Sequence, residues 1–110
     1  MSCWREREVL SDEVIASGGT PQDLYEVAAG QRAEIETVFV TNTSTTTAYT
    51  WGLKINRGSE TWLYRQIDIA AGQTAQVSLR NLPLIAAQKL LGDGSNIAIR
   101  FLVVGRRKTA

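Results

Sequence analysis

The sequence predicts an all-β protein, a single antiparallel sandwich or barrel. Its 110 residues, of which 44% are hydrophobic, are enough for one compact core and too few for two. Apolar and polar residues alternate with a period of two over much of the chain, as they do in strands with one buried face. Clusters of Gly, Asn, Ser, Thr and Pro separate these segments and predict turns between short strands. This pattern is typical of sandwiches and barrels.

The clearest predicted strand is Ala48–Asn56. Within it Tyr49, Trp51, Leu53 and Ile55 fall on one face, and polar or small residues fall on the other. Such alternation predicts that one face packs into the core. We therefore expect Trp51 to be a core residue.

Six further segments, most of them rich in β-branched or aromatic residues, are also predicted to be strands. In chain order they are Glu8–Ala16, Leu24–Val27, Ala33–Asn42, Thr61–Ile69, Thr74–Leu79 and Asn96–Val104. The segment Pro83–Leu91 differs, because Ala, Gln, Lys and Leu are good helix formers and proline suits the first position of a helix. We predict a helical turn there. The alternative is a short strand that ends at a turn formed by Gly92–Gly94.

The lack of histidine and the scarcity of cysteine, two residue types that are common in active sites, argue against an enzyme. The chain has no histidine and one cysteine, Cys3, so it lacks the commonest general base and an intrachain disulfide. Catalysis by carboxylates would depend on Glu60, Asp68 or Asp93, and nothing in their spacing specifies an acid–base pair. We therefore predict no catalytic residue, no cofactor and no metal site.

The charge distribution argues against nucleic acid as a partner. The formal net charge is only +1, whereas nucleic-acid-binding domains are usually strongly basic. Residues 1–36 nevertheless hold eight acids and three arginines, and residues 37–110 hold nine bases and three acids. This asymmetry fits either contacts between the front of one subunit and the back of another or an ordinary mixed surface. No apolar run has the length of a membrane span, and the charged N-terminus lacks the pattern of a secretory signal.

A short motif occurs twice, as VAAGQRAEI at Val27–Ile35 and as IAAGQTAQV at Ile69–Val77. A phosphate-binding loop requires several glycines or a Gly-Lys-Ser/Thr end that leads into a helix. Each copy has one glycine, no lysine, and predicted strands on both sides. We interpret the copies as two equivalent corners of one sandwich, in which the glycine takes a positive φ.

These corners and their neighbours resemble a known family, the small β-sandwich, jelly-roll-like structural proteins of tailed-phage virions. Tyr25–Ala33 is similar to the family's Tyr-x-Val-Pro-Ala-Gly-x-x-Ala signature, with Ala28 where proline is usual. Val40–Ser44 is similar to its strand ending in Asn-Thr-Ser, and Ile69–Gln73 to its second Ala-Ala-Gly corner. Leu91–Ile97 resembles, in a shortened form, the Gly-Asp turn before the last strand. The likeness spans roughly residues 8–105.

The resemblance implies a jelly-roll-like sandwich of about seven to eight strands at residues 8–105, with an extended N-terminal arm (1–7) and a basic C-terminal tail (106–110). It also implies a non-enzymatic virion protein assembled in the host cytoplasm. A capsid decoration (cement) protein is the leading interpretation, and head–tail or tail/baseplate attachment is the alternative. The implied partners are copies of itself, in a trimer or another symmetric oligomer, and the major capsid or other virion proteins.

Large aromatic and arginine side chains are enriched at interface hot spots, which gives a set of candidate interface residues. They are Trp4, Arg5, Arg7, Trp62, Tyr64, Arg65, Arg106 and Arg107. Trp4 either docks on a neighbouring subunit or packs on its own domain. A third function remains open, a carbohydrate-binding module in which Trp62 and Tyr64 form a stacking platform.

Overall fold

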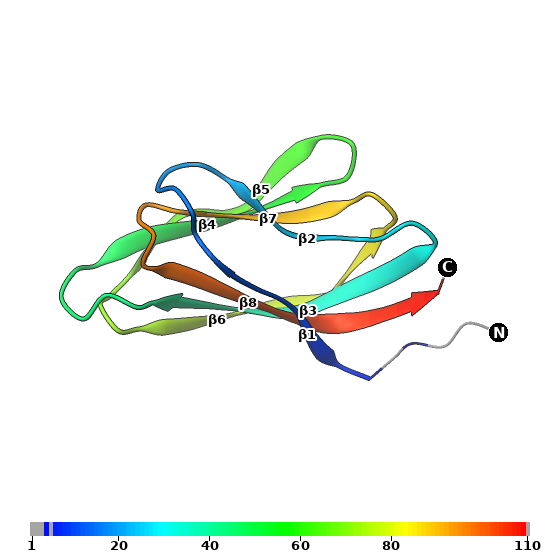
Figure 1. Cartoon of the computed structure of the whole chain (residues 1–110), viewed down its shortest axis with the longest axis horizontal. Helices are drawn as coiled ribbons and strands as arrows, with labels where there is room; N and C mark the ends of the chain where they lie inside the picture. The colour runs from blue at the N-terminus through cyan, green and yellow to red at the C-terminus, as the bar shows by residue number, and fades with distance from the viewer. Residues whose placement is uncertain (1–3, 5, 110) are drawn as a thin grey trace.

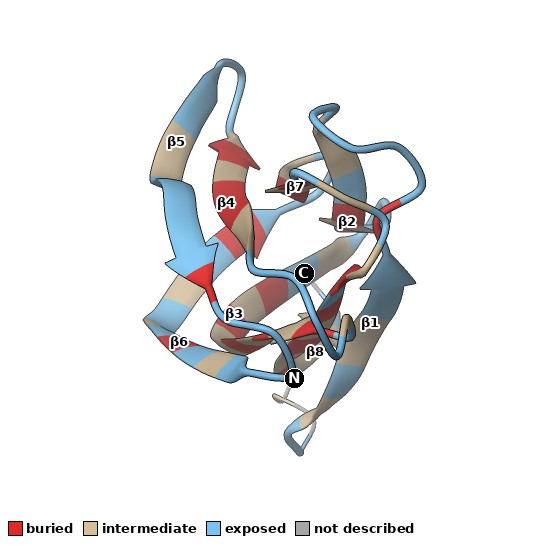
Figure 2. Cartoon of the chain, turned by 90° about the vertical axis from the view of Figure 1, so that its left-hand side faces the viewer, coloured by how far each residue is buried: buried red, intermediate tan, exposed pale blue. Residues whose placement is uncertain are grey.

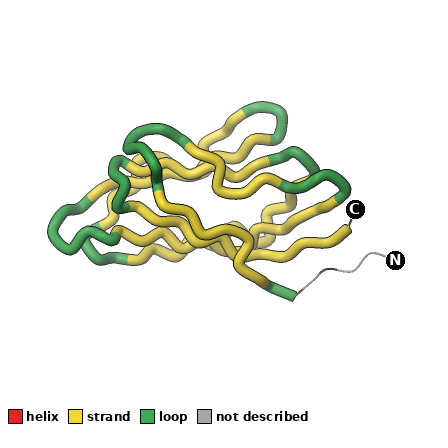
Figure 3. Tube along the Cα trace, in the orientation of Figure 1, coloured by secondary structure: helices red, strands yellow, loops and turns green. Residues whose placement is uncertain are grey.

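The computed structural model describes residue 4 and residues 6–109, which form two antiparallel sheets packed face to face (Figure 1). The described residues form strands, turns and loops, with no helix among them (Figure 3). The eight strands are β1 Glu8–Val14, β2 Gln22–Glu26, β3 Gln31–Asn42, β4 Tyr49–Asn56, β5 Glu60–Ile69, β6 Thr74–Ile85, β7 Lys89–Gly94 and β8 Ile99–Thr109. The predicted all-β, two-sheet architecture is confirmed.

Each sheet contains four strands. The order is β1-β8-β3-β6 in the first sheet and β2-β7-β4-β5 in the second. Successive strands change sheet at every connection except the hairpin between β4 and β5. Neighbouring strands in each sheet are therefore mostly distant in sequence, and long-range pairing determines the fold.

The core lies between the two sheets. Val38 on β3, Leu53 on β4, and Phe101 and Val103 on β8 are completely buried. Trp51 is 4% exposed, which confirms its predicted place in the core. Figure 2 shows that β4 is buried along much of its length, whereas the edge strand β5 is mostly exposed.

The predicted helical turn at Pro83–Leu91 is wrong. β6 continues to Ile85, a tight turn follows at Ala86–Ala87, and β7 occupies Lys89–Gly94. β7 pairs with β2 on one side and with β4 on the other, so hydrogen bonds from both neighbours outweigh the helix propensity of its residues. Pro83 is tolerated because β6 is an edge strand.

The basic residues at 106–108 belong to a strand instead of a tail. β8 continues to Thr109 and pairs with β3 along its whole length, from Asn42↔Ile99 to Gln31↔Thr109. The predicted boundary after residue 105 therefore falls inside β8. These cations are held on the sheet by the ladder.

The uneven charge along the sequence is balanced within the chain. Acids of the first 36 residues pair with bases of the last part, because β1 and β3 flank β8 and β2 flanks β7. The pairs are Glu8–Arg107, Asp12–Arg100, Glu34–Arg106, and both Asp23 and Glu26 with Lys89. Of the two alternatives for the uneven charge, the described structure therefore fits an ordinary surface of mixed charge.

The two glycine-containing corners have the same local geometry. Gly30 and Gly72 have φ values of 75° and 72°, and in each corner the glutamine N–H donates to the carbonyl three residues earlier. One corner connects β2 to β3 and the other connects β5 to β6, so both lead from the second sheet into the first. They are equivalent corners of one sandwich, as the repeat predicts.

The polar side chain of Asn42 is completely buried next to the Ala70–Gln73 corner. Its Nδ2 donates to the carbonyls of Thr47 (2.8 Å) and Ile69 (3.3 Å), and its Oδ1 accepts from the N–H of Ser44 (3.0 Å). The main-chain N–H and C=O of Asn42 both bond to the Ala70–Gln73 corner, at 3.0 and 3.1 Å. Asn42 therefore joins the end of β3 to the start of β6.

Candidate interaction surface

The outer face of the first sheet carries an apolar strip. Phe39 on β3 lies directly opposite Leu102 on β8, and Val104 on β8 lies opposite Val9 on β1. Val9 is 57% exposed, and the other three are partly exposed. Outward-facing positions of a solvated antiparallel sheet are usually polar. We refer to Val9, Phe39, Leu102 and Val104 as the apolar strip.

The strip follows from a run in β8 that is apolar on both faces. Phe101 and Val103 point into the core and are completely buried, so Leu102 and Val104 point outward. Continuous apolar runs are typical of strands that are covered on both sides. This run, FLVV in the sequence, is the signal that could have identified the strip, but aromatic and arginine content alone did not select it.

A hollow of about 430 Å³ lies at one end of the strip, between Phe39, Leu102 and the Asp12–Arg100 pair. Arg100 donates two hydrogen bonds to Asp12, from Nε to Oδ1 (2.8 Å) and from Nη2 to Oδ2 (2.6 Å). These bonds hold the pKa of Asp12 below its usual range and raise that of Arg100. The pair neutralises both charges beside the hollow.

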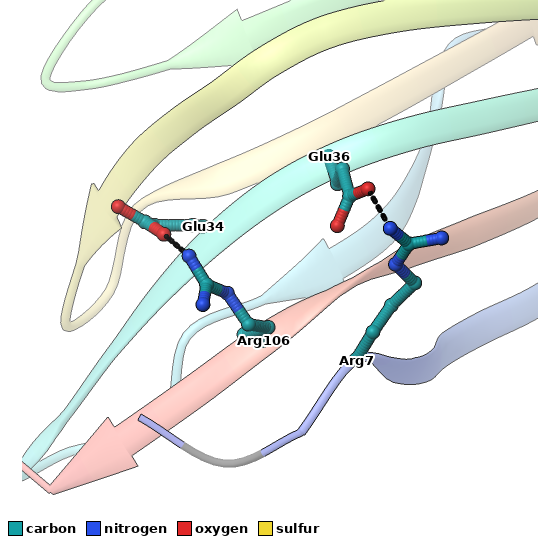
Figure 4. Close-up of polar contacts among 4 residues, drawn as sticks. All are labelled: Arg7, Glu34, Glu36 and Arg106. Atoms are coloured by element: carbon teal, nitrogen blue, oxygen red, sulfur yellow. Dashed lines mark hydrogen bonds and ion pairs between the residues drawn. The ribbon is translucent and has the colours of Figure 1, made fainter. Parts of the chain in front are cut away.

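Two further ion pairs lie at the other end of the strip. Arg7 Nη2 is 2.6 Å from Glu36 Oε1, and Arg106 Nη2 is 2.8 Å from Glu34 Oε1 (Figure 4). Figure 4 shows both carboxylates on β3, with one arginine reaching from β8 and the other from the segment before β1. Exposed pairs of this kind add little stability, about 0–1 kcal/mol each. Their main effect is to remove unpaired charge from the face.

Trp4 also lies on this face. Its ring is 5.7 Å from the Arg106 guanidinium and 4.8 Å from Lys108 Nζ, both on β8. Of the two alternatives for Trp4, the structure shows packing on its own domain. Contact with a neighbouring subunit stays a prediction, and Arg5 lies outside the described residues.

Arg107 lies on the other face of β8, between the sheets. Its Nε donates to Glu8 Oε1 at 2.6 Å, and it also interacts with Tyr25 of β2. Burial raises the pKa of Tyr25, and the charge of Arg107 partly opposes that shift. Arg107 therefore joins the two sheets and is only partly exposed, whereas Arg7 and Arg65 are exposed.

Trp62 and Tyr64 point to opposite faces of the second sheet. The β4–β5 register pairs Trp62 with Lys54 but Tyr64 with Leu53, so the irregularity at this point moves the two aromatics to different sides. Lys54 Nζ lies 4.5 Å from the centroid of the Trp62 ring on the outer side, and Tyr64 contacts the buried Trp51 ring at 5.5 Å. The two side chains do not form the predicted joint stacking platform.

The three candidate catalytic carboxylates are spread over the second sheet. Glu60 pairs with Asn56, and Asp68 pairs with Thr50. Asn56 and Thr50 are six residues apart on β4, about 20 Å at the rise of a strand, so Glu60 and Asp68 are separated by a similar distance. Asp68 and Asp93 are on strands separated by β4, which implies about 10 Å or more between their backbones. In the part of the chain that is described, no three acidic or cysteine side chains are grouped as metal ligands would be.

No protein-family model matches this chain, and no curated protein matches it either. A function has therefore to be inferred from the residues and geometry of the chain itself. Among residue 4 and residues 6–109, no helix is long and apolar enough to cross a membrane.

Proposed function

We propose that this chain is a non-enzymatic structural protein of a tailed-phage virion, a capsid decoration (cement) protein that binds copies of itself and neighbouring shell proteins. The observation that carries the proposal is the outer face of the first sheet, where the apolar strip lies among ion-paired side chains. The placement in a virion and the assembly in the host cytoplasm rest on the sequence resemblance.

The composition of this face fits the anatomy of a protein interface. Interface cores are depleted of charge and enriched in apolar and aromatic side chains, and a polar rim surrounds them. Phe39 and Leu102 provide such a centre, and the Asp12–Arg100 pair provides part of such a rim. Burying apolar surface contributes about 25 cal/mol per Å². Covering the strip is therefore favourable. The charged groups of the three ion pairs around it neutralise each other, so none of them has to be desolvated alone.

The size of the face suits repeated attachment to a shell. The four strands of the first sheet are 7–12 residues long and lie about 4.8 Å apart, so they span a face of at least about 600 Å². Two such faces bury about 1,200 Å², the lower end of stable interfaces. A symmetric oligomer that engages several shell subunits at once gains further affinity from its effective concentration.

The strand order supports the finer fold proposal, a jelly roll. Eight strands in two four-stranded sheets, connected so that successive strands mostly alternate between the sheets, fit a double-sheet jelly roll. Viral capsid domains and lectin domains use this architecture. The same surface would also serve a head–tail or tail/baseplate attachment protein, which is the second candidate within this class.

The location of the protein on particles tests the proposal. Antibody labelling of phage particles purified from the host that produces this chain should decorate the shell, and light scattering of the purified full chain should give a symmetric oligomer. Labelling confined to the neck or tail would replace decoration with the attachment role. A protein that is strictly monomeric and absent from particles would overturn both.

Charge substitutions identify the surface. Leu102→Lys and Val9→Lys each place a cation in the apolar strip, and we expect self-association or shell binding to weaken at least tenfold, about 1.4 kcal/mol. Ile97→Lys is the matched control, because Ile97 is 60% exposed and lies in the turn between β7 and β8. Circular dichroism verifies the fold of each variant. An equal loss in the control would mean that the strip is not the binding surface.

A further inference from the structure

A pocket of about 300 Å³ lies on the second sheet, the sheet that does not carry the apolar strip. Its lining includes Thr50 of β4, Trp62 and Arg65 of β5, Asp93 of β7, and Ser95 just after β7. Polar and aromatic groups from three strands therefore converge on one concave site. This volume is at the small end of the range for ligand pockets, about 300–1,000 Å³.

The wall of the pocket depends on Trp62 lying against β4. A Cβ atom on Gly52 would come within 2.8 Å of Cζ3 of the Trp62 ring, so only a glycine leaves room for the indole. The β4–β5 register shifts at two places, and Gln66 has a positive φ of 52°. Such irregularities redirect side chains. Here they accompany an Arg65 guanidinium 5.2 Å from the Trp62 ring.

The pocket also contains a carboxylate, that of Asp93, with one oxygen atom that lacks a donor among the described residues. Asp93 pairs with Gly52, which places it on the same face as Trp62. Its Oδ1 atom is buried and accepts no hydrogen bond from the described residues. An unsatisfied buried acceptor costs about 1–3 kcal/mol. Because Asp93 lines the pocket, a ligand donor that reaches its carboxylate there would make a charge-assisted hydrogen bond.

The remaining groups define what kind of donor fits. Arg65 provides donors only, and the Ser95 hydroxyl, which accepts the N–H of Thr50 at 2.9 Å, has its own proton to donate. A ligand must therefore donate to Asp93 and accept from Arg65 and Ser95. Hydroxyl groups do both. An anion would be repelled by Asp93, and a cation by Arg65 and by Lys54 beside Trp62.

We propose that this pocket binds one neutral sugar residue of a glycan, with the apolar C–H face of the sugar against Trp62 and its hydroxyls on Asp93, Arg65 and Ser95. Trp62 acts here without Tyr64, which lies on the other face of the sheet. This site is separate from the apolar strip and does not depend on the proposed virion role. Recognition of a glycan would be a second activity of the same domain.

The test is titration of the full chain with the methyl glycosides of glucose, galactose, mannose and N-acetylglucosamine, followed by the indole N–H resonances in NMR. We expect at least one glycoside to shift the Trp62 resonance saturably, with millimolar affinity, while the Trp4 resonance stays in place. No saturable shift with any of the four, and no binding on a glycan array, would overturn the proposal.

Variants locate the binding site. Trp62→Leu and Asp93→Asn should each weaken binding at least tenfold, because they remove the stacking surface and the charged acceptor. Tyr64→Leu is the matched control, an aromatic of the same strand on the opposite face, and should bind the sugar as the unmodified chain does. Unchanged binding in both pocket variants would place the sugar elsewhere. Since Leu102→Lys leaves this pocket intact, loss of shell binding and loss of sugar binding are separable.

Discussion

The corners Ala70–Gln73 and Ile85–Gln88 form the same turn, but only one of them has a glycine. In both, the glutamine N–H donates to the first carbonyl (3.1 and 3.0 Å), and the glutamine Oε1 accepts the first N–H (2.8 and 3.0 Å). The third residue is Gly72 in one and Ala87 in the other, with φ values of 72° and 69°. The glutamine bonds are therefore the common feature of the turn, which can form without a glycine.

The two corners also differ in what fixes them. The first is bonded to the main chain of the buried Asn42. The second is bonded to Val27, because the Ala87 N–H donates to the Val27 carbonyl (2.9 Å) and the Val27 N–H donates to the Gln88 carbonyl (3.0 Å). A residue with a side chain in the left-handed region persists only where its surroundings determine its conformation. The bonds to Val27 provide that restraint for Ala87.

The largest expected effect comes from removing the anchor of the first corner. Asn42→Ala leaves the carbonyls of Thr47 and Ile69 and the N–H of Ser44 without their side-chain partner. We expect a loss of about 3 kcal/mol in the free energy of unfolding, measured by urea denaturation. The control is Asn96→Ala, which removes one bond to the Ala98 N–H in a loop and should cost about 1 kcal/mol. Equal losses would contradict an anchoring role for Asn42.

Exchanging the glycine tests the first corner directly. Gly72→Ala forces a side chain into the left-handed region, and the lower entropy of the unfolded chain offsets part of that strain. We expect unfolding to become easier by about 1 kcal/mol in urea or thermal denaturation. Gly30→Ala should behave alike, since Gly30 has a φ of 75°. No change in either variant would show that both glycine corners tolerate alanine as the Ile85–Gln88 corner does.

The reverse exchange tests the second corner. Ala87→Gly relieves the strain at φ 69° but increases the entropy of the unfolded chain, so we expect a net stabilisation of about 0.5–1 kcal/mol. Ala86→Gly is the matched control within the same turn. Ala86 has no positive φ, so its exchange should destabilise by about 0.5–1 kcal/mol. Stabilisation by the control instead of Ala87→Gly would contradict this account of the turn.

The smallest expected effect concerns the bonds that the corners share. Gln73→Ala and Gln88→Ala each remove one exposed side-chain acceptor from a main-chain N–H. We expect each to lower the free energy of unfolding by about 0.5 kcal/mol, the low end for an intramolecular hydrogen bond. Similar values would support a common turn. A loss several times larger at Gln88 would mean that the corner without glycine depends more on its side chain.

Much of the fold could be predicted because strands leave a local signal. The alternation around Trp51 identified a strand and its buried face, and all seven predicted strand segments overlap strands of the structure. At β7 a strand was given only as the alternative to a helical turn, because residues Lys89–Gly94 have helix-forming and turn-forming preferences. Its neighbours β2 and β4 are distant in sequence, and a short window cannot show that both will pair with it.

The candidate surfaces could be predicted less completely. Residue type selected Trp4, Arg7 and Arg106, which the structure brings together on one face. Residue type did not select Phe39 and Leu102. An apolar residue is expected in the core, and only the strand register shows that these two point outward. The same reason explains why Trp62 and Tyr64, two residues apart, were expected on one face.

The period-two strands and the two corners with glycine can be predicted from the sequence alone, which also lacks histidine. These follow from residue type and from neighbours within a few positions. Four features become visible only in the folded chain: β8 lies between β1 and β3, Asp12 pairs with Arg100, Ala87 has a positive φ, and Trp62 and Tyr64 point to opposite faces. Each of these depends on hydrogen bonds or packing between distant segments, and such contacts exist only after the chain has folded.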